Sequence, residues 1–473
     1  MFVIDDSMNK FLGLNNGDEP QVPLGHSEKC RKMFREIADG VTCVYLCMED
    51  ADELCKIACE TGQKPEQISF SLLSDAVIQY DAQFFRNTEQ YTDQVISRSY
   101  RPYFLSFIVS GEMITVEQMQ MLRSGWFECI HADNGTDSDK DGILLTGTLV
   151  TSASPVSRIE NWQLRFTNRA LPATVLADIH NTYDPSLFPI CGNVQKFLED
   201  AWEEDTIQYI DIYNVGKGNA DYICGKKHRI LYDIGYDYMH RPKAIAKQDP
   251  FSKAVAAIRN LKPHCVILSH WDLDHIIGCA YAPQRIFTVK WIAPTLDKDK
   301  INAIRLARYL NIYGNLALVD RKQKPKLVAR IVGPKTQISL WLGSGKDKRI
   351  TPANCHGLFL ELFDHDTEKN ILLAGDVPYI CMPGALFEKT IHFLHVPHHC
   401  SKMNLSPLRR GDKLGIGAVI TSYNHDKARD KKHDGVLKKK YRGVYYITKS
   451  IHSRVEYPLA ERICRPFDFV IER

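Results

Sequence analysis

A run of seven residues, Ser269–His275, constrains the fold of this chain more than any other segment. It holds two histidines and two aspartates within six consecutive positions and follows the apolar segment Val266–Leu268. The apolar segment predicts a strand, and side chains two apart on an extended chain point the same way. Three side chains can therefore converge, and a fourth enters from the next position: His270, Asp272, Asp274 and His275. Buried together, these groups need a cation, so the run predicts a metal-binding loop rather than a polar loop that caps a helix.

Length and composition narrow the class of protein. A chain of 473 residues predicts two domains. The formal net charge of +3 excludes a polycation, so any affinity for nucleic acid must come from a local patch. The 14 cysteines are scattered without a CxxC pair, which indicates free thiols in a reducing compartment. The N-terminus lacks the pattern of a signal peptide and no run of eighteen apolar residues occurs, so we expect a cytoplasmic protein with no membrane contact.

The chain changes character near residue 200. Residues 1–200 mix helical patterns with apolar strands and predict a separate α+β domain, whereas residues 206–473 predict strands separated by turns and helices. In the second part, polar residues follow strands repeatedly. A predicted hairpin, 357–363 with 371–374, runs into Asp376, and the strand that ends at Val396 runs into His398 and His399. Open α/β sheets place their sites at such strand ends.

The order of these segments resembles the metallo-β-lactamase fold and, within it, the hydrolase domain of ComEC-type competence proteins. The matching segments are Asn214–Ala220, Asp233–Gly235, His270–His275 with Gly278, Leu372–Asp376 and Val396–Ser401, followed by Ser422–Asn424, His433 and Val444–Thr448. The resemblance covers about residues 206–455 and implies an αββα sandwich preceded by the α+β domain. Lys217, Asn219 and Cys400 depart from the usual Gln, Asp and Gly, and the chain has no transmembrane channel.

The resemblance also implies a dinuclear metal site. His270 and Asp272 would hold one metal, and Asp274 and His275 the other. Two further parts complete the implied site: Asp376 as the bridge, and either His398 or His399 as the remaining ligand of the second metal. The wider family has histidine where this chain has Asp272, and the added oxygen favours two Mn²⁺ ions as the first choice over Zn²⁺ or Mg²⁺.

Several residues have two possible roles. The candidate catalytic residues are Asp274, His399, Ser401, Lys217 and His433. Ser401 could donate to a phosphate or cap a helix, and Lys217 could reach a scissile phosphate or be solvated. His433 could contact substrate or donate a proton. Asp233 could orient His270 or His275 or be satisfied by backbone, and His356 could replace the missing third-motif histidine.

The expected function is that of a soluble metal-dependent nuclease or phosphodiesterase. The basic stretch Lys427–Arg442 supports nucleic acid as the substrate, although a solvated helix face would give the same pattern. One alternative is a metallohydrolase of a small molecule, such as a cyclic nucleotide or an acylated metabolite. A second is an effector or sensor, as in a bacterial defence system, whose N-terminal domain binds a protein partner and controls the hydrolase.

Overall fold

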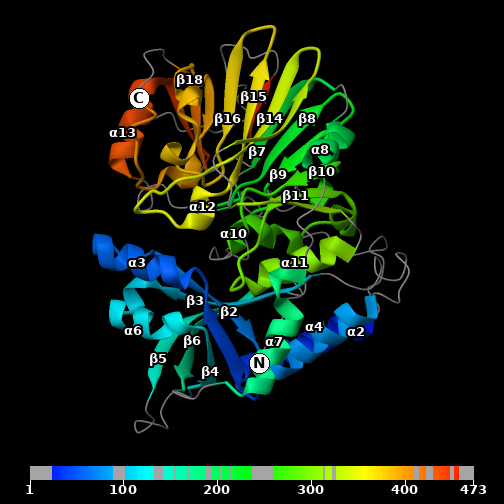
Figure 1. Cartoon of the computed structure of the whole chain (residues 1–473), viewed down its shortest axis with the longest axis vertical. Helices are drawn as coiled ribbons and strands as arrows, with labels where there is room; N and C mark the ends of the chain where they lie inside the picture. The colour runs from blue at the N-terminus through cyan, green and yellow to red at the C-terminus, as the bar shows by residue number, and fades with distance from the viewer. Residues whose placement is uncertain are drawn as a thin grey trace, which may run out of the picture. The chain divides into compact units, whose positions relative to one another are not determined.

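Figure 1 shows the computed structural model, which divides into two compact units. The structure describes residues 24–88, 102–132, 142–152, 156–167, 171–187, 193–202, 205–213, 215–216, 218–236, 259–312, 315–321, 326–409, 415–421, 430–447 and 452–456. One unit, here the barrel unit, comprises Met1–Phe188 and Leu296–Tyr313. The other, here the sandwich unit, comprises Pro189–Thr295 and Gly314–Arg473. Lys217 and Ser422–Asn424 lie outside the described residues.

The barrel unit is built on a closed six-stranded barrel with the strand order β1-β2-β3-β5-β6-β4. The strands are β1 (Val44–Met48), β2 (Gln67–Leu73), β3 (Phe104–Ser110), β4 (Trp126–His131), β5 (Ile143–Ser152) and β6 (Val156–Phe166). The helices are α2 (Leu24–Ala38), α3 (Ala51–Thr61), α4 (Asp75–Thr88), α6 (Val116–Met121), α7 (Ala173–Tyr183) and α11 (Ile301–Ile312). Phe70, Phe107 and Trp162 are buried, and their rings contact one another edge to face or tilted, which fills the core of this unit.

Helix α11 belongs to the barrel unit although it lies far along the sequence from the strands that it contacts. The Arg305 side chain is fully buried and its Nε donates to Asp81 Oδ2 at 2.8 Å. Its guanidinium stacks 4.1 Å from the ring centre of Tyr103, and the Asn302 side chain bonds the backbone of Leu105. A buried guanidinium needs a carboxylate, so the segment is an integral part of this unit's core.

The sandwich unit contains two seven-stranded sheets. The first has the order β12-β11-β10-β9-β8-β7-β20: β12 (Leu316–Val319), β11 (Lys290–Pro294), β10 (Cys265–Ile267), β9 (Arg229–Tyr232), β8 (Asp221–Gly225), β7 (Ile207–Tyr213) and β20 (His452–Glu456). The second has the order β13 to β19: β13 (Lys326–Val332), β14 (Thr336–Leu342), β15 (Leu358–Asp364), β16 (Lys369–Leu373), β17 (Phe393–His395), β18 (Gly415–Thr421) and β19 (Tyr441–Ile447). Its helices include α8 (Val194–Trp202), α10 (Leu273–Ile276), α12 (Pro352–Cys355) and α13 (Lys431–Lys440).

One apolar core lies between the two sheets and explains why they pack together. Ile230 and Ile267 of the first sheet and Leu360 and Leu373 of the second belong to the same buried cluster. Helix α8 adds Leu198, Ala201 and Trp202 to this core. The domain boundary expected from the sequence lies at residue 200. In the structure the boundary comes before α8, because the apolar face of α8 is buried in the sandwich unit.

Four loops follow parallel strands, two from each sheet, at the C-terminal ends of those strands. β9 and β10 are parallel neighbours in the first sheet, and β16, β17 and β18 are parallel in the second. The predicted hairpin is confirmed as the antiparallel pair β15–β16. The loops that follow β9, β10, β16 and β17 carry most of the polar residues singled out from the sequence. Within the described part of the chain, no helix has both the length and the apolar character needed to cross a membrane.

Candidate metal centre

The loop after β10 turns at once into the short helix α10, which brings the predicted ligands together. Asp272 is extended and precedes the helix, whereas Asp274 and His275 lie within it. The Trp271 indole Nε1 donates to the carbonyl of Pro294 at 2.6 Å and anchors the loop. A Cβ atom at Gly218 would lie 2.2 Å from the Asp274 carbonyl oxygen, so the glycine-rich turn is needed for close backbone approach.

The loops after β16 and β17 supply the second half of the site with a strained backbone. His398, His399 and Cys400 have φ values of 49°, 53° and 66°, all in the left-handed region. This is costly for residues with a Cβ and is typical of functional loops. Cys400 thus occupies a left-handed position that glycine adopts without strain. The strain turns two imidazoles toward the end of β16, where Asp376 follows Gly375.

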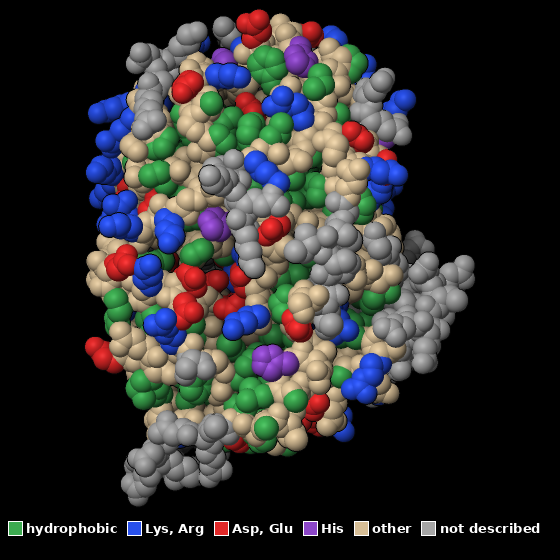
Figure 2. Space-filling view, in the orientation of Figure 1, with side chains coloured by type: hydrophobic (Ala, Val, Ile, Leu, Met, Phe, Trp, Pro, Cys, Tyr) green, Lys and Arg blue, Asp and Glu red, His purple; other side chains and the backbone are tan. Residues whose placement is uncertain are grey.

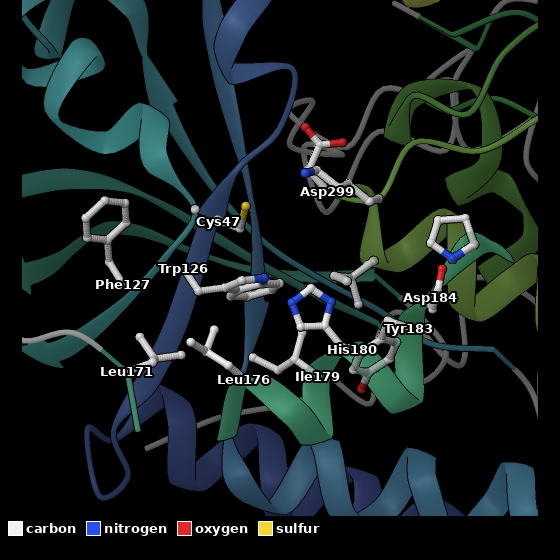
Figure 3. A pocket seen from close by; sticks show the side chains of 14 residues that line it. Cys47, Trp126, Phe127, Leu171, Leu176, Ile179, His180, Tyr183, Asp184 and Asp299 are labelled. Carbon is white, nitrogen blue, oxygen red and sulfur yellow. The ribbon is translucent and has the colours of Figure 1, made fainter. Parts of the chain in front are cut away.

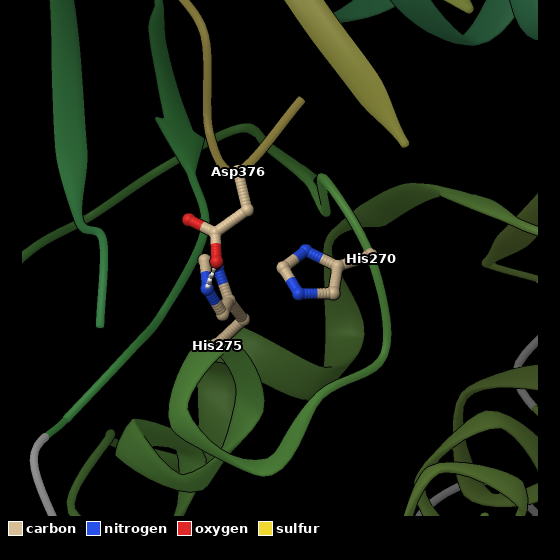
Figure 4. Close-up of side chains that lie close together, drawn as sticks. All are labelled: His270, His275 and Asp376. Carbon is tan, nitrogen blue, oxygen red and sulfur yellow. Dashed lines mark ion pairs between the residues drawn. The ribbon is translucent and has the colours of Figure 1, made fainter. Parts of the chain in front are cut away.

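The side chains meet in two overlapping groups, and Figure 4 shows the one that contains Asp376. His270, His275 and Asp376 form one group, and Asp274, His275 and His399 form the other, with the ligand atoms of each group within 4.8 Å of one another. Asp376 Oδ2 lies 3.5 Å from His275 Nε2 and 3.7 Å from His398 Nε2. Residues separated by more than a hundred positions thus share one buried centre.

Hydrogen bonds fix the tautomers of the first two histidines. Asp233 Oδ1 accepts from the Ser269 backbone N–H at 2.6 Å, and Asp233 Oδ2 accepts from Ser269 Oγ at 2.7 Å. His275 Nδ1 lies 2.9 Å from the same Oδ2, so in the neutral ring Nδ1 carries the proton. Because the Ser269 hydroxyl proton is used on Asp233, Ser269 Oγ accepts from His270 Nδ1 at 3.0 Å. Each ring therefore presents its Nε2 lone pair to the centre.

The third histidine is fixed in the same way. His399 Nδ1 lies 3.0 Å from the Thr421 carbonyl oxygen, which can only accept. Within the described part of the chain, the Nε2 atoms of His270, His275 and His399 are buried without a hydrogen-bond donor. Lone pairs that face carboxylates in a buried space are unsatisfied unless a cation lies between them. This donor set fits a divalent metal.

The electrostatics of the centre favour the ligand forms of two groups. Burial raises the pKa of Asp376, but the neighbouring imidazoles of His275 and His398 outweigh it and hold the pKa well below its usual value. Burial lowers the pKa of His399 to about 3, which keeps its Nε2 unprotonated at neutral pH. For His275, burial lowers the pKa, but Asp376 and Asp233 outweigh it and raise the pKa. A divalent ion held by His275 would therefore compete with a proton for this imidazole.

A layer of buried groups behind the centre was not found from the sequence. His395 Nδ1 lies 2.8 Å from Asp221 Oδ2, and its Nε2 lies 3.3 Å from Thr421 Oγ1, next to the carbonyl that holds His399. Asn219 Nδ2 donates to Asp376 Oδ1 at 3.4 Å. His395 could have indicated this layer from the sequence, because it is a histidine in an otherwise apolar strand just before the His398–His399 pair.

Of the other predicted metal residues, Asp274 belongs to the second group, whereas Asp272, His398 and the candidate His356 lie outside both groups. The Asp272 side chain is 28% exposed and its Oδ2 lies 3.2 Å from His270 Nε2, but it is in neither group. Burial raises the pKa of Asp274, which belongs to the second group. The His398 side chain is 31% exposed, and its Nε2 lies 3.7 Å from Asp376 Oδ2. His356 ends helix α12 and lies in neither group.

Two predicted catalytic residues form a support beneath the strained loop. His433 is fully buried, with Nδ1 donating to the Ser401 carbonyl at 3.0 Å and Nε2 2.9 Å from the Tyr379 hydroxyl. Both ring nitrogens are therefore occupied, and His433 holds the loop rather than presenting a free nitrogen to substrate. The Ser401 backbone N–H donates to the His398 carbonyl at 2.9 Å, which closes the turn.

Comparisons with known proteins identify the class of the second half of the chain. Residues 213–411 match the model of the metallo-beta-lactamase superfamily. The chain is thus a mixed α/β protein with a domain of this metal-dependent hydrolase superfamily in its C-terminal part. No curated protein matches the chain.

Several solved structures are similar over part of the chain. The metallo-beta-lactamase fold protein YhfI from Bacillus subtilis is 12% identical, with a TM-score of 0.29, over 51% of this chain and 98% of that protein. Unliganded PDE1 from yeast is 11% identical, with a TM-score of 0.30, over 52% of this chain and 99% of that protein. CmlA from Streptomyces venezuelae, a diiron beta-hydroxylase, is 11% identical, with a TM-score of 0.32, over 53% of this chain and 54% of that protein. Similarities this weak do not indicate what the chain acts on.

Proposed function

We propose that the sandwich unit is a metal-dependent phosphodiesterase that cleaves nucleic acid, in the manner of ComEC-like hydrolases. The observation that carries the proposal is the set of three buried imidazole Nε2 atoms that face carboxylates and have no donor among the described residues. The residues that would hold two divalent ions are His270, Asp272, Asp274, His275, Asp376 and His399, with His398 beside them. Such a pair of ions supplies a water nucleophile at neutral pH and polarises the phosphate oxygens.

The chain's own residues prepare this chemistry by holding the ligands rigid. Asp233 keeps the Nδ1 proton of His275, and the Thr421 carbonyl keeps that of His399. Asn219 donates to one oxygen of Asp376, which leaves the other oxygen directed at His275 and His398. Fixed tautomers and orientations remove the reorganisation that ligand binding would otherwise require.

Helix α13 supports nucleic acid as the substrate because it begins on the metal loop. The Asp430 backbone N–H donates to the Cys400 carbonyl at 3.0 Å, and the Asp430 side chain caps the helix by accepting from the His433 N–H at 2.7 Å. Lys431 and Lys432 are exposed in the first turn, and further lysines follow in the last turn. Figure 2 shows Lys and Arg side chains gathered along the edge where Figure 1 draws α13. Such a row can follow a phosphate backbone that enters the site.

The ligand chemistry supports manganese as the first metal to test. Asp274 and Asp376 lie in the two groups, and Asp272 adds a carboxylate where the wider family has histidine. Carboxylate-rich sets favour Mn²⁺ or Mg²⁺, while the three imidazoles keep Zn²⁺ open.

Cleavage of labelled polymers tests the proposal. Purified full-length protein is incubated with single- and double-stranded DNA and RNA and with Mn²⁺, Mg²⁺ or Zn²⁺, alongside an Asp274→Ala, His275→Ala variant. We expect metal-dependent cleavage of at least one polymer by the wild type and none by the variant. The absence of cleavage with every metal would refute the nuclease proposal, and cleavage of a cyclic nucleotide alone would favour the small-molecule alternative.

Salt dependence tests the role of α13 separately. Each phosphate contact adds about 0.7–0.9 to the slope of log affinity against log salt. A Lys431→Glu, Lys432→Glu variant should therefore weaken polymer binding and reduce the slope by about one to two. Lys335→Glu is the matched control, because Lys335 is also exposed in the sandwich unit but pairs with Asp366 in a hairpin. Equal effects in both variants would show that α13 has no specific role.

A further inference from the structure

The barrel unit contains a cavity of about 700 Å³ that the metal centre does not use (Figure 3). Its walls come from the ends of β1 and β4, from helix α7 and from the segment that leads into α11, all within this one unit. A volume of this size is typical of small-molecule sites, which often lie at the mouths of barrels. The cavity is therefore large enough for a ligand and is placed where ligands bind.

A tryptophan side chain forms part of the cavity wall. Trp126 begins β4 opposite Cys47 of β1, at the rim of the barrel. The preceding residue, Gly125, has φ 117° and ψ −139°, a conformation that only glycine adopts readily, so the turn that leads into Trp126 requires a glycine. Figure 3 shows the Trp126 indole beside the His180 imidazole, with Leu176 on the same side. Trp126 is only half-buried, which leaves ring surface for a planar partner.

Acidic groups at the edge of the cavity restrict which kinds of ligand could bind there. Asp299 Oδ2 accepts from the Asp50 N–H at 2.7 Å, and Asp184 Oδ1 accepts from the Ser186 N–H at 2.8 Å. A carboxylate has about four acceptor positions, so both can still accept from a ligand. Among the described residues that line the cavity, Lys298 is the one Lys or Arg side chain. Two carboxylates and one ammonium favour a donor-bearing ligand and disfavour a polyphosphate.

We propose that this cavity binds a planar nitrogen heterocycle of nucleoside size, stacked on Trp126 with its amino or imino edge toward Asp184 or Asp299. The site is separate from the metal centre, and the proposal stands whether or not the sandwich unit is a nuclease. A nucleoside supplies a flat ring, exocyclic donors and a polar sugar without phosphate charge, which matches the cavity in shape and sign.

Titration of full-length protein with adenosine, guanosine, cytidine, uridine and ATP tests the proposal by calorimetry, with no divalent metal added. We expect at least one nucleoside to bind with a Kd below about 1 mM and ATP to bind more weakly than adenosine. Trp126→Leu should weaken binding at least about tenfold, because stacking on an aromatic ring contributes about that factor. Trp341→Leu is the matched control, a half-buried tryptophan in the sandwich unit.

Three results would overturn the proposal: no nucleoside binds, ATP binds more tightly than adenosine, or Trp126→Leu binds as well as the wild type. If circular dichroism shows that Trp126→Leu does not fold, the His180→Ala variant replaces it as the test of the proposal. His180 is exposed on α7, so its loss should leave the fold intact. It should weaken nucleoside binding about threefold, and unchanged binding would overturn the proposal.

Discussion

Replacing Asp233 by asparagine tests the tautomer argument most sharply. Asp233 is fully buried and accepts from the Ser269 N–H, from Ser269 Oγ and from His275 Nδ1, at 2.6, 2.7 and 2.9 Å. An asparagine has one acceptor oxygen, so its NH₂ group must face some of these donors. If the NH₂ donates to His275 Nδ1, the ring proton moves to Nε2 and the lone pair for the metal is lost. Asparagine tolerates the left-handed backbone at this position, where φ is 59°, so the fold should survive.

The expected effect is a loss of metal affinity. Removing a group that orients a metal-binding histidine costs about 10- to 100-fold in affinity, or about 1.4–2.8 kcal/mol. Competition against a chromophoric chelator measures the Kd for Mn²⁺ and Zn²⁺ directly. Asp364→Asn is the matched control, because Asp364 is 1% exposed in the same unit and accepts hydrogen bonds in the β15–β16 turn, from the Asp366 N–H and Thr367 Oγ1. An unchanged Kd in Asp233→Asn, or an equal loss in both variants, would refute the tautomer argument.

Three further variants probe other parts of the structure. The Asp205 carboxylate accepts four backbone N–H bonds, which outweigh burial and lower its pKa. The charged carboxylate therefore stabilises the folded protein above the ordinary aspartate pKa, and this stabilisation is lost as pH falls through the folded-state pKa. Asp205→Asn should therefore lower the free energy of unfolding by about 2 kcal/mol at pH 7, with the difference shrinking below about pH 4, as urea denaturation would show; a difference independent of pH would contradict this. Asp81→Asn should destabilise the barrel unit by about 3–5 kcal/mol, because it leaves the Arg305 charge buried without its counterion; a loss below about 1 kcal/mol in thermal unfolding would contradict the buried pair. His395→Leu should weaken metal binding about tenfold through the support of His399, with little change in secondary structure by circular dichroism, and an unchanged Kd would exclude a positioning role.

The sequence predicted the site best where ligand-type residues directly follow a strand. The loops after β10, β16 and β17 were identified because ligand-type residues directly follow short apolar runs: His270 to His275, Asp376, and His398 with His399. The loops after β16 and β17 meet because parallel neighbouring strands present their carboxyl ends at one edge of a sheet, whereas their meeting with the loop after β10 depends on how the two sheets pack. The superfamily of residues 213–411 was also predicted correctly from the order of these motifs.

Other features depend on contacts that no local pattern encodes. His433 matches a motif residue, yet only the fold reveals that its ring is enclosed by Ser401 and Tyr379. The support of His399 by Thr421 joins the turn after β17 to the end of β18, and hydrogen bonds of this kind leave no periodicity in the sequence. The same holds for α11, because its sequence does not show which unit buries it; the Arg305–Asp81 pair places it in the barrel unit.

Metal stoichiometry tests the central claim most directly. Full-length protein is loaded with Mn²⁺ or Zn²⁺, dialysed to equilibrium and analysed by inductively coupled plasma mass spectrometry beside His275→Ala. Because His275 belongs to both ligand groups, we expect about two ions per chain in the wild type and at least one fewer in the variant. Wild-type protein that retains no metal, or a variant that retains as much as the wild type, would contradict the proposed dinuclear centre.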